Sequence, residues 1–299
     1  MTDVKTLPKP LIDVIAGFFA GIASTVIGHP LDVIKTRLQV DRSSIHVGGS
    51  VRIARDIVRN DGTVRGLYRG FTPNVVGNSL GWAAFFLWYG KAQEAFHVYR
   101  GSQEALSYYD HFLASGAAGL LTSLCTNPIW VIKTRMLSTS SKYPGAYTSI
   151  LDGSRQILRS EGLAGFYRGL IPSLVGVSHG AVFFAVYEPL KSWRARMKHE
   201  ADTSTLDTLI VTTVGKIIAA SATYPYQVVR ARLQTYDAGA EYRGVRDTME
   251  QIRQAEGLKG FYKGMGPGLV RVLPSVWVTF LVAEKMKLAM TRGFLGGFS

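Results

Sequence analysis

Six apolar stretches, separated by polar and charged segments, run along the chain of 299 residues. Six are too many for the core of one soluble domain of this size. Each continuous stretch is shorter than the roughly 20 residues that a membrane-spanning helix needs, so the helices must continue into their polar flanks. The pattern predicts an all-α membrane protein with six transmembrane helices, built around Leu11–Ile27, Val75–Tyr89, Phe112–Thr126, Leu174–Tyr187, Leu209–Tyr224 and Leu269–Ala283.

The charged segment after every second apolar stretch is one motif in three copies. PLDVIKTR begins at Pro30, PIWVIKTR at Pro128 and PYQVVRAR at Pro225, so the copies are 98 and 97 residues apart. A second motif follows each copy, as DGTVRGLYRGFTP, EGLAGFYRGLIP and EGLKGFYKGMGP. Self-similarity at a fixed period indicates repeated structural units. We therefore predict three repeats in one membrane domain, at residues 10–98, 109–197 and 206–292.

The motif prolines and charges predict an internal cavity. A proline inside a helix removes a hydrogen bond and bends the axis, so each motif should kink its helix. Charge near the bilayer centre costs about 2.5–3.5 kcal/mol on insertion scales and faces the bundle interior or a wet cavity. Three kinked helices in threefold pseudo-symmetry would converge at one end, where the charges could close and reopen a pore. The side chains brought together would be Asp32, Lys35, Lys133 and Arg230.

Three polar segments between the apolar pairs have helical spacing. They read GSVRIARDIVRND, TSILDGSRQILRS and GVRDTMEQIRQA, and the loops around them are rich in arginine and lysine. Basic amphipathic helices of this kind lie on the membrane surface, and short basic loops mark the side that is not translocated. Ordinary solvated helices are the alternative for each segment taken alone.

Composition narrows the classes of function. The chain has 34 Lys+Arg against 21 Asp+Glu, a formal charge of +13, which suits nucleic acid, acidic lipid or an acidic small molecule as a partner. Cys125 is the single cysteine, which excludes an internal disulfide framework and a multi-cysteine metal site. The three histidines nearest the motifs have no acidic or thiol companions at metal-ligand spacing, and GMGPG is a poor dinucleotide fingerprint. We therefore expect no enzyme activity, no cofactor and no metal.

The two linked motifs in three registered copies resemble those of the mitochondrial carrier family, over about residues 10 to 292. This resemblance implies six transmembrane helices around a central substrate cavity, with three surface helices on the matrix side. It also implies a multi-pass protein of the mitochondrial inner membrane, with both termini in the intermembrane space. Transport would proceed by alternating access, with a network of ion pairs closing each end of the cavity.

At the matrix end, the sequence departs from the family pattern. The motif position that usually carries an acid holds Asp32, Trp130 and Gln227. By the family's pairing, Asp32 would bridge Lys133, whereas Lys35 and Arg230 would lack an acidic partner. Glutamines occupy the positions that often brace such pairs in two of the repeats, and a leucine occupies the third. These positions are Gln39, Gln234 and Leu137.

The cytoplasmic end is also incomplete by the same resemblance. The pattern of aromatic, acid and base gives YEPLK in the second repeat and AEKMK in the third, but YGKAQ in the first. The expected gate residues are therefore Glu188, Lys191, Glu284 and Lys287, with Glu188 to Lys287 as the expected pair.

Two cations within apolar stretches are the first candidates for substrate binding. Arg271 lies inside GLVRVLPSVWVTF, where an unpaired cation is costly unless it faces a cavity with an anionic ligand. Lys216 occupies a position at which the other repeats have glycine, which suggests a wet helix face, with snorkelling to the interface as the alternative. Neutral candidates at similar depth, which could equally bond helix to helix, are Asn74, Asn78 and His179. The resemblance to the carrier family also implies a substrate contact at Gly176.

The expected substrate follows from a narrower resemblance. Trp130 in NPIWVIKTR resembles the Pro-Ile-Trp variant of carriers for folate, FAD, NAD and pyrimidine nucleotides, and its ring could stack on a heteroaromatic substrate or simply pack. SHGAVFFAVYE and ATYPYQVVRARLQ resemble the FAD/folate carriers in particular. We predict transport of FAD or folate by a monomer in contact with membrane lipid, with cardiolipin as one candidate. The alternatives are an NAD or pyrimidine-nucleotide exchanger, a non-specific membrane scaffold or leak, and a soluble nucleic-acid binder, which the six apolar stretches disfavour.

Overall fold

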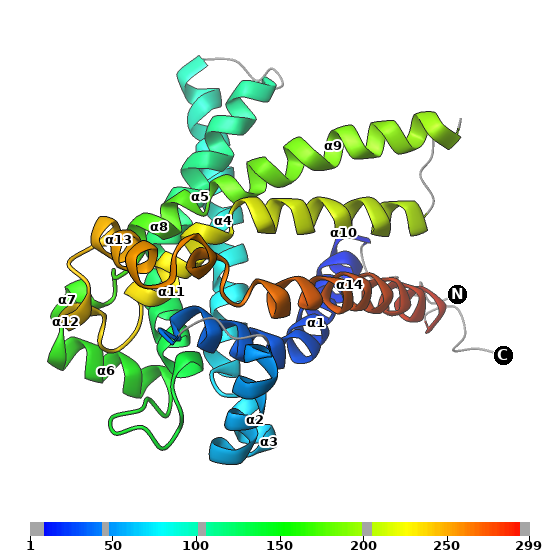
Figure 1. Cartoon of the computed structure of the whole chain (residues 1–299). Helices are drawn as coiled ribbons and strands as arrows, with labels where there is room; N and C mark the ends of the chain where they lie inside the picture. The colour runs from blue at the N-terminus through cyan, green and yellow to red at the C-terminus, as the bar shows by residue number, and fades with distance from the viewer. Residues whose placement is uncertain (1–8, 44–47, 101–105, 199–204, 294–299) are drawn as a thin grey trace.

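The computed structural model describes residues 9–43, 48–100, 106–198 and 205–293, and its regular secondary structure over these residues is helical (Figure 1). Each predicted apolar stretch lies in one long helical span, so the expected six spans are confirmed. Four spans are single helices, a fifth is a short helix followed by a long one, and the sixth is broken. The spans are α1 (Lys9–Val40), α4 (Phe71–Arg100), α5 (Tyr108–Ser138), α8 (Leu170–Val175) with α9 (Ser178–Lys198), α10 (Thr205–Ala222) with α11 (Tyr224–Leu233), and α14 (Met265–Gly293).

The three predicted surface segments are also helices. They are α2 (Gly49–Asp61), α6 (Ile150–Ser160) and α13 (Val245–Glu256). Each turns one fully buried isoleucine toward the preceding span, at Ile57, Ile157 and Ile252. The remaining short elements are α3 (Thr63–Leu67), α7 (Gly162–Gly165), α12 (Ala238–Glu241) and the 3-10 helix η1 (Leu258–Tyr262). Three small apolar cores therefore lie where each surface helix meets the end of the span that precedes it.

The motif prolines act differently in the three repeats. Pro30 and Pro128 lie inside α1 and α5, which continue through them as single helices. In the third repeat the helix is broken at Thr223, and the two parts differ in direction by 58°. Pro225 lies in the first turn of α11, where its missing N–H needs no intrahelical partner. The expected bend is therefore a full break in the third repeat.

The spans pack as three antiparallel pairs, and each pair joins two repeats. α4 lies along α5, α9 along α10, and α14 along α1, so the last span closes back on the first (Figure 1). The pairs diverge from one another away from the end that carries α2, α6 and α13 (Figure 1). This arrangement leaves room between the pairs, bounded at one end by the charged motifs.

Large apolar side chains cover the outside of the spans rather than a central core. Exposed examples include Phe18, Trp82, Phe86, Leu121 and Trp277. Within the described residues, three helices are long and apolar enough to cross a membrane by length and composition alone, or four if the broken α10–α11 pair counts as one span. α4 and α5 are as long, at 30 and 31 residues, but polar and small side chains lower their hydropathy. Four of those polar side chains, those of Asn74, Asn78, Lys133 and Thr134, line the cavity described next.

Candidate functional site

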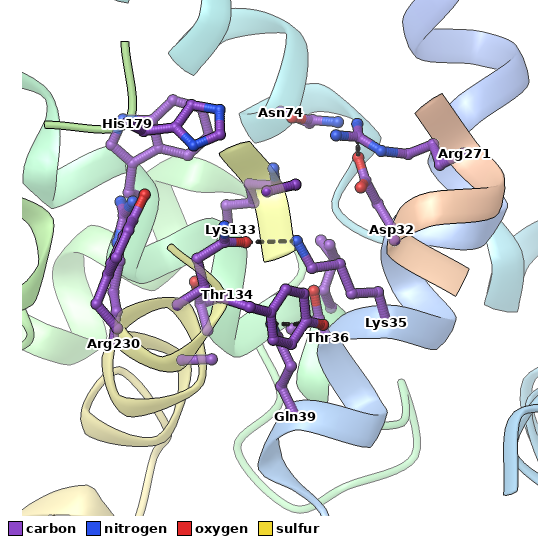
Figure 2. A pocket seen from close by; sticks show the side chains of 18 of the residues that line it. Asp32, Lys35, Thr36, Gln39, Asn74, Lys133, Thr134, His179, Arg230 and Arg271 are labelled. Atoms are coloured by element: carbon purple, nitrogen blue, oxygen red, sulfur yellow. Dashed lines mark hydrogen bonds and ion pairs between the residues drawn. The ribbon is translucent and has the colours of Figure 1, made fainter. Parts of the chain in front are cut away.

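A cavity of about 610 Å³ lies between the three helix pairs, next to the charged motifs (Figure 2). Its size falls within the range of about 300–1,000 Å³ that is typical of small-molecule sites. All three repeats supply lining residues. The polar and aromatic ones include Asp32, Lys35, Thr36, Gln39, Asn74, Asn78, Trp130, Lys133, Thr134, His179, Phe183, Lys216, Tyr224, Tyr226, Gln227, Arg230, Gln234 and Arg271.

The cavity is strongly cationic. Five basic side chains line it against one carboxylate, that of Asp32, which leaves a formal excess of four positive charges. The basic residues are Lys35, Lys133, Lys216, Arg230 and Arg271. A concave site lined by one sign of charge raises the local concentration of the opposite ion. The geometry therefore favours an anionic ligand with more than one negative charge.

Asp32 pairs with Arg271 and not with Lys133. Arg271 Nη1 lies 3.1 Å from Asp32 Oδ2, and Lys133 makes no ion pair with a described residue. The expected bridge from Asp32 to Lys133 is therefore wrong for this conformation. The physical reason is packing: α14 runs along α1, which places the guanidinium beside the carboxylate, whereas α5 approaches α1 less closely.

The Lys133 ammonium lies instead over the ring of Trp130, 4.8 Å from its centroid. The Arg230 guanidinium contacts the same ring, at 5.7 Å. Trp130 Nε1 donates to Thr126 Oγ1 at 3.2 Å, which fixes the ring. Cations are attracted to the face of an indole, most strongly where water is scarce. The indole thus takes the place of an acid for two cations of the cavity.

Lys35 also has a neutral partner. Its ammonium donates to Gln227 Oε1 at 2.8 Å and lies 5.3 Å from the ring centroid of Tyr224. Lys35 therefore contacts an amide oxygen and an aromatic ring, and no carboxylate among the described residues, as expected from the glutamine at that motif position.

The sequence of the whole chain matches that of a known family. A profile of mitochondrial carrier proteins matches residues 7–100, 104–198 and 201–294. The chain belongs to the mitochondrial carrier family. The mitochondrial FAD carrier protein FLX1 of Saccharomyces cerevisiae is 35% identical over 92% of this chain and 96% of its own length. The folate transporter 1 (chloroplastic) of Arabidopsis thaliana is 37% identical, over 91% and 92%. The nicotinamide adenine dinucleotide transporter 2 (mitochondrial) of the same plant is 35% identical, over 95% and 81%.

The carrier's fold is thus that of six transmembrane helices in three repeats around a central cavity. The motif end of the cavity corresponds to the predicted matrix gate. Two glutamines that we expected to brace its ion pairs are bonded elsewhere. Gln39 Nε2 donates to the Tyr224 hydroxyl at 3.1 Å, and Gln234 Oε1 accepts from Thr134 Oγ1 at 2.8 Å. Hydroxyls from neighbouring repeats lie within reach of both amides, so each glutamine links two repeats rather than bracing a charged pair.

The neutral candidates are partly engaged in bonds within the bundle. Asn74 Nδ2 lies 3.1 Å from His29 Nδ1, and Asn78 Nδ2 donates to Asn74 Oδ1 at 3.2 Å. His179 Nδ1 lies 2.8 Å from Thr223 Oγ1. All three candidate side chains nevertheless line the cavity, as does Lys216. They can therefore present their remaining polar atoms to a ligand.

Gly176 is not among the cavity-lining residues. A Cβ at this position would lie 3.0 Å from the ring of Tyr226, so the glycine allows that ring to approach α8. Tyr226 itself lines the cavity. Sequence reasoning missed it, although a signal was present: the residue after the motif proline is leucine and isoleucine in the first two copies and tyrosine in the third.

A second layer of charge lies on the outer side of the motifs, and sequence reasoning also missed it. The last arginine of each motif pairs with the acid of the following acid-glycine motif. The pairs are Arg37–Asp61 at 2.9 Å, Arg135–Glu161 at 2.5 Å and Arg232–Glu256 at 2.6 Å. The common signal was an acid that follows the last motif arginine at a similar spacing, 24, 26 and 24 residues later in the three repeats. These pairs tie each surface helix to its span.

The carboxylate of Asp61 lies outside the spans and shows how firmly this layer is held. Burial acts to raise its pKa, but hydrogen bonds from Ser140, Arg37 and Ser141 outweigh burial and lower the pKa far below its usual value. A carboxyl with a lowered pKa stabilises the fold above its unfolded pKa and loses this effect only as the pH falls toward the folded pKa. The pair with Arg37 is therefore intact throughout the neutral range.

The predicted cytoplasmic gate residues lie where the helix pairs diverge. Lys191 lies 6.0 Å from the ring centroid of Tyr187. Glu188 and Glu284 form no ion pair with another described residue, and the side chain of Lys287 lies outside the described part of the structure. The expected pair of Glu188 with Lys287 stays a prediction.

Proposed function

We propose that this carrier transports FAD or folate. One observation carries the proposal: the cavity holds five basic side chains and a single carboxylate, together with aromatic rings. Both substrates combine a flat heteroaromatic ring with negative charge away from that ring, which is a pyrophosphate between two ring systems in FAD and the carboxylates of the glutamate end in folate. The similarity to relatives named as an FAD carrier and a folate transporter supports the same substrate class.

In this proposal, Arg271 and Lys216 bind the anionic end of the substrate. A guanidinium matches phosphate and carboxylate oxygens equally well, so the arginine serves either substrate. The ring end would lie against the aromatic side of the cavity, where Trp130, Tyr226 and Phe183 are found. Asn74, Asn78 and His179 would then supply hydrogen bonds that orient the substrate.

Transport by alternating access would use the two ends of the cavity in turn. The floor formed by Asp32, Lys35, Lys133 and Arg230 would act as the matrix gate, and its mixture of one ion pair, a neutral amide and an indole should hold it weakly. Glu188, Lys191, Glu284 and Lys287 would close the cytoplasmic side when the diverging helix ends come together.

A second candidate substrate is NAD, with pyrimidine nucleotides beside it. Three relatives are named as nicotinamide adenine dinucleotide transporters, and the first of them matches with the same 35% identity as the FAD carrier. NAD also carries a pyrophosphate and flat rings, so the charge of the cavity suits it too. The choice between these substrates depends on the experiment below.

We further propose that the carrier is a monomer of the mitochondrial inner membrane, with both termini in the intermembrane space. The start of α1 and the end of α14 lie at the same end of their pair, which supports a common side for the termini (Figure 1). The apolar outer surface would contact lipid, including cardiolipin. The named relatives include mitochondrial and chloroplastic proteins, so a fluorescent fusion with fractionation is the direct check of location.

Uptake into liposomes by the purified full-length protein tests the proposal. Radiolabelled FAD, FMN, a reduced folate, NAD and UTP would be compared, with and without each compound inside as a counter-substrate. We expect uptake of FAD or the folate to exceed that of NAD and UTP. Strong NAD exchange without flavin or folate uptake would contradict the choice of substrate.

A further inference from the structure

The ion pair between Asp32 and Arg271 joins a residue of the predicted gate to a residue of the predicted substrate site. Its two atoms lie 3.1 Å apart, and the partners belong to the first and last spans, 239 residues apart in the chain. Asp32 is the one carboxylate among the cavity-lining residues. Arg271 therefore already carries an anion when the cavity holds no substrate.

Arg271 is held in place for this contact by the packing of its stem. Gly28, one turn before Asp32 on α1, lies against the arginine: a Cβ there would be 3.2 Å from Arg271 Cγ and 3.3 Å from Cδ. The glycine thus leaves a slot for the aliphatic part of the side chain. The aspartate then meets the guanidinium at the end of that slot (Figure 2).

The guanidinium is not fully used by this pair. Asp32 takes Nη1, whereas Arg271 Nε is buried and has no hydrogen-bond partner. A guanidinium offers a fork of donors that fits two oxygens of one carboxylate or phosphate. Arg271 also remains 38% exposed at its side chain, against 12% for Asp32. A second anion can therefore reach the arginine from the cavity.

The Asp32 carboxylate has two other possible ion-pair partners in the cavity. Lys35 and Lys133 enter the same cavity from α1 and α5, and neither has a carboxylate partner among the described residues (Figure 2). A carboxylate released from Arg271 would thus find an ammonium nearby. The loss of one pair would be offset by the gain of another.

We propose that Asp32 is an internal competitor for the anionic group of the substrate. It occupies Arg271 in the empty cavity, and an incoming phosphate or carboxylate displaces it toward Lys133. This inference rests on the proposed function and adds a selection rule to it. A singly charged compound only replaces one anion by another, whereas a compound with two or more charges also engages Lys216 and gains binding energy.

Equilibrium binding to the purified full-length carrier tests the inference. The probes are FAD, FMN, folate, NAD and neutral riboflavin, and the variants are Asp32→Asn, Arg271→Gln and the double variant. We expect Asp32→Asn to bind FMN, FAD or folate about 10-fold more tightly, a typical size for coupling between two sites, and to leave riboflavin unchanged. The gain should vanish in the double variant, because the arginine that both anions share is absent.

A variant that keeps the negative charge shows whether tighter binding by Asp32→Asn comes from the lost charge or from a change in structure. Asp32→Glu keeps the competing carboxylate and should bind the anions as the wild type does. Should Asp32→Asn fail to fold, Asp32→Ser replaces it in the same series. Tighter binding of FMN but not of folate would assign the competition to phosphate, and the reverse would assign it to carboxylate.

The outcomes separate this inference from the proposed function. If the wild type binds flavin or folate but Asp32→Asn binds it no more tightly, internal competition is wrong and the proposed function stands. If the wild type binds only NAD, the substrate choice is wrong, and the same variants measured with NAD decide the competition. A wild type that binds none of these anions contradicts both.

Discussion

The two basic residues of each motif belong to two different layers of charge. The outer layer lies away from the cavity and consists of Arg37, Arg135 and Arg232. Each of these arginines pairs with the acid of the following motif, so the outer layer is the same in all three repeats. Lys35, Lys133 and Arg230 lie two positions earlier and face the cavity. Their partners are not uniform: Lys35 contacts an amide, whereas Lys133 and Arg230 share one indole.

The difference shows where the repeats are constrained and where they are free to vary. The outer pairs hold each surface helix to its span, a task that is the same in all three repeats. In the proposed transport cycle, the inner positions would contact the substrate and would also have to exchange partners as the floor opens. Uniform strong pairs suit the first task, and uneven weaker contacts suit the second.

Breaking the outer layer should have the largest effect. Arg135 is 1% exposed, bonds Glu161 at 2.5 Å and the Tyr147 hydroxyl at 2.8 Å, and has no neutral substitute of its shape. Arg135→Met should lower the free energy of unfolding by about 3–5 kcal/mol, the usual result of removing one partner of a buried pair. Thermal unfolding in detergent would measure this, with the exposed Arg155→Met as control. Equal midpoints for the two variants would show that the outer layer is not structural.

Substitution in the inner layer should affect transport more than stability. Arg271→Gln removes the charge that we propose binds the substrate, while the amide can still donate to Asp32. Uptake of the transported anion should fall by about 30-fold or more, as for the truncation of one partner of a charged contact. The thermal midpoint should change little. Arg246→Gln, on the exposed face of α13, is the matched control, and wild-type uptake by Arg271→Gln would remove this residue from the site.

The sequence predicts the features that repeat along the chain but not the contacts between distant spans. The six spans, the three surface helices and the convergence of the motifs depend on periodic patterns, which a single sequence displays. The partner of Asp32 follows from no periodic pattern, because Arg271 lies 239 residues away and reaches Asp32 only through the packing of α14 on α1. The role of Gly28 is hidden for the same reason: the slot that it leaves exists only when the first and last spans are side by side.

An acid placed at the motif position of Gln227 would make one contact of the inner layer resemble the ion pairs of the outer layer. Gln227→Glu would place a carboxylate beside the Lys35 ammonium, where the amide oxygen is now 2.8 Å away. The ammonium already makes this a charged bond, and a carboxylate would add direct attraction between opposite charges, so the thermal midpoint should rise. Transport should become slower, because opening the floor would break a stronger contact. The gain should disappear when Lys35→Gln is added, and a gain that persists would place its origin outside this pair.

The smallest expected effect concerns the indole that two cations share. Trp130→Leu keeps an apolar side chain but removes the ring face that Lys133 and Arg230 contact, at a loss of about 1 kcal/mol, the range of cation–π contacts. Trp130→Phe should lose less, because it keeps a smaller ring. The control is Trp82→Leu, since Trp82 is 65% exposed on the outer face and touches neither cation. If Leu and Phe at position 130 lowered the midpoint equally, packing volume would explain the tryptophan; if only Leu did so, the ring would be acting in place of the acid.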